Sequence, residues 1–150
     1  MFRRILVATG GSPWSRHAVD TAVRLAAAEH AELIIVHILE DEPAYQPQEW
    51  TAIDPQLRAE MEETGQQILT HATEQAAQAN IAPQTVMHWG AIPEQIVRVA
   101  TQTPCDLIVM GTRHLTGEKR LMTGRICNAV IATAPCPVLV VPLVQGPVGP

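Results

Sequence analysis

Short apolar runs, several rich in β-branched residues, alternate along this chain with longer stretches in which apolar residues recur every three or four positions. The runs lie at 5–8, 33–39, 85–89, 106–110 and 137–142. Runs without regular polar alternation are typical of strands buried on both faces. The pattern therefore predicts five short strands.

The stretches between the runs have helical spacing. Ser12 before Pro13 is typical of an N-cap followed by the first helical residue. Asp54 and Pro55 open a longer stretch to about Asn80, in which Leu57 falls on the predicted buried stripe. Helices are thus predicted at about 13–29 and 55–80, from 93 onward, and at about 124–134.

Strict alternation of strands and helices predicts an α/β fold, with a parallel sheet covered by helices on both faces. We expect one Rossmann-like domain over 1–142, an open sheet of five parallel strands, and a flexible tail over 143–150. Loops are expected at 40–54 and 111–123. Ligands of such sheets bind beyond the carboxyl ends of the strands, where the strand order reverses. The loops after the first, second and fourth strands are therefore the places to search.

Composition narrows the classes of partner. The 150 residues fit one domain, and the formal net charge is −5. An acidic chain with 3% aromatic residues argues against nucleic acid or an anionic membrane as the main partner. No apolar stretch has the length of a secretion signal core or a membrane span, so we expect a cytoplasmic protein. The cysteines at 105, 127 and 136 have no disulfide or zinc spacing and are expected to be buried thiols.

Four segments together resemble universal stress proteins. Residues 5–9 followed by 11–13 resemble the first strand and turn of that family. Residues 106–113 resemble its fourth strand, residues 134–142 resemble its last strand, and Gly90 with Pro93 is a weaker match. The resemblance covers about residues 3–142. It implies a stress-response regulator that binds an adenine nucleotide, ATP or AMP with a possible Mg²⁺, as a homodimer paired through Val138, Leu139, Val140 and Val141.

The resemblance also implies a set of nucleotide-binding positions. They are Ala8, Thr9, Gly10, Ile38 (through its backbone), Met110, Gly111, Arg113, His114, Gly124, Arg125 and Ile126. Binding members resemble G-x2-G-x9-G-(S/T) after the fourth strand, and carry an Asp in the first turn. In this chain His114 stands in place of the middle glycine, Arg125 in place of the hydroxyl residue, and Gly10 in place of the Asp.

The segment from Gly111 to Arg125 is basic. It contains four Lys or Arg residues against Glu118 alone, a local charge of about +3 in a chain of −5. A basic loop ahead of a helix start favours an anion, and Arg125 offers a guanidinium fork for phosphate. The alternatives are a solvated loop or contacts to an acidic partner surface.

Three functions remain open from the sequence. The first is a nucleotide-responsive dimer with little or no catalysis, since no Ser/His/Asp set is recognisable. The second is a ligand-free interaction module that has lost the site through Gly10, His114 and Arg125. The third is a weak ATPase, which needs a carboxylate that positions water and a metal. Asp106 is expected to act as a turn or cap residue, and His37 as a packed strand histidine.

Overall fold

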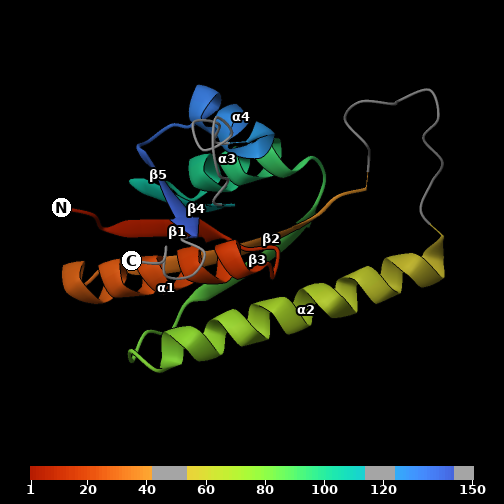
Figure 1. Ribbon diagram of the computed structural model, residues 1–150, viewed down its shortest axis with the longest axis horizontal. Helices are drawn as coiled ribbons and strands as arrows, with labels where there is room; N and C mark the ends of the chain where they lie inside the picture. Colours follow the sequence, from red (N-terminus) through yellow and green to blue (C-terminus); the bar gives the residue numbers. More distant parts are fainter. Residues whose placement is uncertain (42–53, 114–123, 144–150) are drawn as a thin grey trace, which may run out of the picture.

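A computed structural model describes residues 1–41, 54–113 and 124–143 of the 150 (Figure 1). Strands and helices alternate strictly. They are β1 (Arg4–Ala8), α1 (Pro13–Glu29), β2 (Glu32–Leu39), α2 (Pro55–Ala77), β3 (Gln84–Trp89), α3 (Ile92–Gln102), β4 (Leu107–Arg113), α4 (Arg125–Thr133) and β5 (Val138–Leu143). Within these ranges no helix combines the length and apolar character needed to cross a bilayer.

The five strands form one parallel sheet in the order β3-β2-β1-β4-β5. β1 lies at the centre and pairs with β2 on one side and with β4 on the other. The chain therefore builds the sheet outward in one direction to β3, and then in the other direction to β5. This reversal opens a crevice at the carboxyl ends of β1 and β4, where ligands of open α/β sheets bind.

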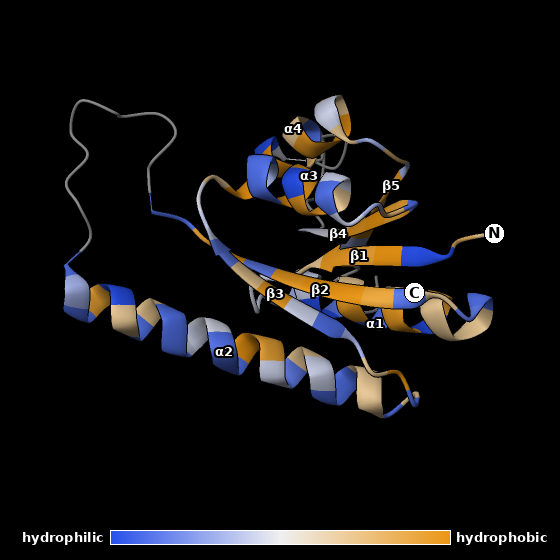
Figure 2. Ribbon diagram, turned by 180° about the vertical axis from the view of Figure 1, so that it is seen from behind, coloured by the Kyte–Doolittle hydropathy of each residue, from blue (hydrophilic) through white to orange (hydrophobic). Residues whose placement is uncertain are grey.

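Helices cover both faces of the sheet, so the predicted architecture is confirmed. α1 and α2 lie on one face, and α3 and α4 on the other (Figure 1). Ile5 and Val7 of β1 pack toward α1 and α2, whereas Leu6 packs toward α3 and α4. All three are fully buried. In Figure 2 the central strands β1 and β2 are largely orange, the colour of apolar residues.

The two edge strands are less buried than the central ones. Every residue of β3 is at least partly accessible to solvent. In β5, Val141 is buried, whereas Leu139 is 37% exposed. Both strands are thus as exposed as strands at the edge of a sheet usually are.

The long helix α2 differs from its prediction at both ends. It ends at Ala77, and Asn80 has a φ of 59°, a left-handed conformation that stops a helix. Leu57, predicted to be buried, is 47% exposed. The reason is that the buried residues of α2 begin at Gly65, while its amino-terminal turns run beyond the sheet (Figure 2).

Gly65 brings α2 close to the sheet. A β-carbon there would lie 2.7 Å from Sδ of Met87 and 2.9 Å from Cδ2 of His37. The imidazole of His37 is held in turn, because its Nδ1 lies 2.8 Å from the carbonyl oxygen of Thr9. His37 is therefore a packed residue with a fixed ring, as the sequence predicts.

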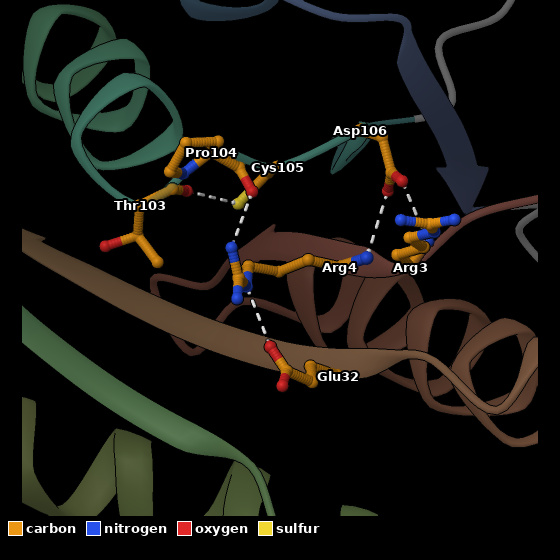
Figure 3. A network of polar contacts seen from close by, with 7 residues as sticks. All are labelled: Arg3, Arg4, Glu32, Thr103, Pro104, Cys105 and Asp106. Atoms are coloured by element: carbon orange, nitrogen blue, oxygen red, sulfur yellow. Dashed lines mark hydrogen bonds and ion pairs between the residues drawn. The ribbon is translucent and has the colours of Figure 1, made fainter.

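A polar network closes the amino ends of the central strands (Figure 3). The carboxylate of Asp106 accepts hydrogen bonds from the backbone N–H groups of Arg3, at 2.8 Å, and Arg4, at 3.0 Å. Arg4 Nε donates to Glu32 at 2.8 Å. Its Nη1 donates to the carbonyl of Pro104 at 2.9 Å. Asp106 thus joins β1 to β4, the cap role predicted for it.

Candidate functional site

A pocket of about 520 Å³ lies at the carboxyl end of the sheet. Its walls come from the first turn of α1, Glu40 after β2, residues 91–93 at the start of α3, residues 110–113 of β4, and residues 124–127 at the start of α4. Most of the wall is apolar, and two arginines enter it. The pocket occupies the crevice that the strand order creates beside β4.

The structure brings together six of the residues predicted to bind a nucleotide. They are Met110, Gly111, Arg113, Gly124, Arg125 and Ile126. All belong to the exit of β4 or the start of α4. The arrangement follows from topology, because a helix that follows a strand in a parallel sheet begins near that strand's carboxyl end. His114 lies outside the described residues.

The other predicted positions lie apart from this pocket. Gly10 and Ile38 border a second cavity of about 430 Å³, between the end of β2 and α2, and Glu40 lines both cavities. Ala8 is partly buried against the α3–α4 side of the core. Thr9 is buried with 6% of its surface exposed. Thr9 also lines a third cavity, of about 290 Å³, beside α2. In the described structure, therefore, the predicted positions divide among three cavities and the core.

The hydroxyl of Thr9 holds the turn after β1. It donates to Ser15 Oγ at 3.2 Å and accepts from the backbone N–H of Gly11 at 3.3 Å. Ser12 caps α1, since its Oγ accepts from the N–H of Ser15. This set of bonds fixes the direction in which α1 leaves the sheet, and so fixes the pocket wall that α1 supplies.

The two glycines that line the pocket are needed for different physical reasons. A β-carbon at Gly111 would collide with the backbone carbonyl of Trp14, so this glycine lets the start of α1 lie directly on β4. Gly124 has a φ of 88°, which side chains disfavour, and its missing β-carbon faces open space. Gly111 thus serves packing in this structure, whereas Gly124 serves the backbone turn into α4.

Several lining residues were missed by the sequence analysis. Trp14 forms part of the wall from the second position of α1, and residues 91–93 form another part from the start of α3. Trp14 carried a usable signal, because it follows the N-cap of a helix that leaves the carboxyl end of β1. The region after β3 was not among those searched, and Ile92 and Pro93 begin the helix that follows it.

The described part of the pocket is cationic and carries one thiol. Arg113 and Arg125 both line it, and the guanidinium carbon of Arg113 lies 5.8 Å from the centre of the Trp14 ring. Cys127 donates its thiol hydrogen toward the carbonyl of Gly111 at 3.7 Å. Burial raises the pKa of the Cys127 thiol, so it stays neutral near pH 7. In the described ranges no three His, Cys, Asp or Glu side chains gather as metal ligands do.

Comparison with known proteins places the chain in a family. The family model for universal stress proteins matches residues 1–142. The chain belongs to the universal stress protein family. The matched span contains every strand that contributes to the sheet except the last residue of β5.

Individual relatives agree with this assignment. The universal stress protein YxiE of Bacillus subtilis is 34% identical, over 94% of this chain and 99% of that protein. The crystal structure of a family member from Burkholderia pseudomallei is 29% identical, with a TM-score of 0.71 over 93% of this chain and 96% of that one. A third protein of the family was solved in complex with cAMP. It is 26% identical, with a TM-score of 0.65 over 93% of this chain and 96% of its own.

Proposed function

We propose that this chain binds an adenine nucleotide in the pocket beside β4 and works as a stress-response regulator rather than as an enzyme. The observation that carries the proposal is the pairing of Arg113 and Arg125 with an apolar wall in one crevice. Arginine forks suit phosphate groups, and an apolar wall suits a base. The volume of about 520 Å³ lies within the range usual for small-molecule sites.

The start of α4 adds to the attraction for phosphate. Gly124 precedes this nine-residue helix, and Arg125 is its first residue. A helix start presents backbone N–H groups and the positive end of the helix dipole. Arg125 brings a full positive charge to the same place, and so compensates for the hydroxyl residue that the family pattern has there.

The relative solved with cAMP supports the choice of base, because that family member was found with an adenine nucleotide. A Mg²⁺ ion would enter with the phosphates of ATP, since this ion usually keeps several waters and binds through phosphate oxygens and one or two carboxylates. Catalysis is not part of the proposal, because the described pocket contains a single carboxylate, Glu40, and no recognisable nucleophile and base pair.

Calorimetric titration with ATP, ADP, AMP and cAMP, each with and without Mg²⁺, tests the proposal. We expect saturable binding of at least one nucleotide and a matching rise in the melting temperature. Arg125→Ala should weaken that binding by about tenfold, since a charge-assisted phosphate contact is removed. Arg98→Ala, an exposed arginine on α3 that does not line the pocket, is the control.

Absence of binding at millimolar concentrations of all four nucleotides would contradict the proposal. The ligand-free interaction module would then be the better description. Phosphate release above that of Arg125→Ala, in matched preparations, would instead favour the weak ATPase.

We also propose that two copies pair through β5. Among the described strands β5 pairs with β4 alone, and Leu139 is 37% exposed on this strand. A short apolar edge strand favours pairing with another strand, and two-fold symmetry makes the same edge serve both copies. Leu139→Lys should raise the monomer fraction in sedimentation velocity. Thr85→Lys on the opposite edge strand, β3, is the matched control, and equal behaviour of the two variants would refute this interface.

A further inference from the structure

Trp14 and Arg113 meet at the pocket from different elements. Trp14 is the second residue of α1, and Arg113 is the last residue of β4. Both line the cavity, and the guanidinium carbon lies 5.8 Å from the centre of the indole ring. That distance is within the range of a cation–π contact.

The root of the Trp14 side chain is held firmly. Its carbonyl oxygen lies against the α-carbon of Gly111, so closely that no β-carbon fits between them. One residue before it, Pro13 fixes the first turn of α1, and Ser12 caps that turn. The indole therefore starts from a fixed point on the wall, whereas Arg113 is exposed and has a long side chain with many rotamers.

The chemistry of guanidinium makes this contact useful for binding an anion. Its N–H donors lie in the plane of the group, and an aromatic ring stacks against the face of that plane. A guanidinium that lies on an indole can therefore still donate its N–H groups to a phosphate. Ordering the side chain before the ligand arrives also reduces the entropy that binding costs.

We propose that Trp14 is a positioning residue that holds the guanidinium of Arg113 for a phosphate group in the pocket. This inference rests on the proposed function, since it concerns the phosphate end of the same ligand. It predicts that Trp14 contributes to binding through Arg113, and that the ligand does not need a base for the contribution to appear. A lysine at position 113 would not replace the arginine, because an ammonium group has no flat face.

The chain contains a second pair of the same kind, which provides a control. The guanidinium carbon of Arg58 lies 4.0 Å from the centre of the Trp89 ring, and Trp89 Nε1 donates to Glu62 at 3.1 Å. Neither Arg58 nor Trp89 lines the pocket. Substituting Trp89 therefore changes a comparable pair without touching the proposed anion site.

The test is a double-mutant cycle with two probes, AMP and inorganic pyrophosphate, titrated by calorimetry into the full chain. Trp14→Leu should weaken the binding of both probes alike, by about two- to fivefold. In an Arg113→Ala background, the same substitution should cause no further loss. Trp14→Phe should retain much of the affinity, because it keeps an aromatic face, and Trp89→Leu should leave both affinities unchanged.

The outcomes separate this inference from the proposed function. If the wild type binds neither probe and none of the other three nucleotides, both fail; if it binds another nucleotide but neither probe, the positioning role alone fails. If the wild type binds AMP but Trp14→Leu weakens AMP alone, Trp14 contacts the base and the positioning role is wrong. An equal loss with and without Arg113, or no loss at all, would also overturn it. Should Trp14→Leu fail to fold by circular dichroism, Trp14→Phe with and without Arg113→Ala supplies the same comparison.

Discussion

The two ends of the sheet use similar side chains in opposite ways. At the amino end, Arg4 donates to Glu32 and to a backbone carbonyl, while Asp106 receives two backbone N–H groups. At the carboxyl end, Arg113 and Arg125 line a pocket whose walls are mainly apolar. A charge used for stability is placed against a complementary partner within the fold. The two arginines proposed to bind a ligand line a pocket that a ligand can reach.

The predictions below test this division, beginning with the largest expected effect. Most are measured as a change in stability, the Asp106 substitution also as a change in nucleotide affinity, and the last as a labelling rate. A substitution at the amino end should change stability alone.

Gly111→Ala should be the most damaging substitution. The added β-carbon would collide with the backbone carbonyl of Trp14, and neither backbone can move without disturbing α1 or β4. We expect a loss of about 3 kcal/mol in the free energy of unfolding, the upper range for an overpacked site. Urea denaturation measures it. Gly10→Ala is the matched control, because a β-carbon there meets nothing within 4 Å, and an equal loss in both variants would contradict this account.

Asp106→Ala should have the next largest effect. It removes the acceptor for the N–H groups of Arg3 and Arg4 and leaves the start of β1 without its link to β4. Loss of hydrogen bonds to a charged group should cost about 2 kcal/mol of stability. Nucleotide affinity should stay the same in the calorimetric assay. A change in affinity with an intact fold would show that the two ends are coupled, against the division proposed here.

The carboxylate of Asp106 should also make the stability of the protein depend on pH. Burial raises the pKa of Asp106, but the N–H donors of Arg3 and Arg4 lower it, and the net pKa lies below its ordinary value of 3.8. The stabilisation is therefore fully present above about pH 4 and is lost as the pH falls through the lower folded-state pKa. The stability difference between wild type and Asp106→Asn, measured in urea from pH 6 to pH 2, should shrink over that acid range. A difference that stays constant would rule out this linkage.

Gly124→Ala should have a smaller effect. The residue has a φ of 88°, so an alanine would be strained although space is available for its β-carbon. We expect a loss of about 1 kcal/mol in thermal or urea unfolding, from backbone strain alone. Gly124→Asn should lose less, because asparagine tolerates positive φ values better than alanine does. The reverse order would indicate that φ is not the cause.

The smallest effect is expected for alkylation of the buried thiols. Burial, and to a smaller extent the neighbouring Cys136, raise the pKa of Cys105 to about 11. Since the thiolate is the reactive form, alkylation of Cys105 at pH 8 should be far slower in the native protein than in urea. Mass spectrometry of the labelled peptides measures both rates. Rapid native labelling of Cys105 would show that this amino-end region opens readily.

The fold was predictable because strands that are buried on both faces appear in the sequence as continuous apolar runs. The runs at 5–8 and 33–39 have no polar alternation, and the structure places helices on both sides of them. The exposure of Leu57 was not predictable. Helical spacing alone does not show which turns of a helix pack on the sheet and which extend beyond it. The pattern of apolar residues also does not predict the order of the strands in the sheet, because that order depends on pairings between strands far apart in the sequence, such as β1 with β4.

The site was predictable in part for a similar reason. Gly111, Arg113 and Gly124 belong to consecutive elements, so their sequence positions place them together. Trp14 and Pro93 reach the same pocket from α1 and α3. Trp14 had a signal in its place at the start of the helix after β1, whereas only the three-dimensional arrangement brings Pro93 to the pocket. The function of Gly111 was also hidden, since a glycine needed against Trp14 and one needed against a phosphate look the same in a sequence.

The central place of β1 has a consequence for how the chain is made. β1 is synthesised first, and its partner β2 follows within about one helix, but the contact between Arg4 and Asp106 spans 102 residues. During translation, β1 must therefore wait with one edge unpaired until β4 leaves the ribosome, and pairings this distant slow folding. The pocket beside β4 forms later still, because residues 124–127 at the start of α4 also line it, so the nucleotide proposed above could bind only after residue 127 of the 150 has emerged.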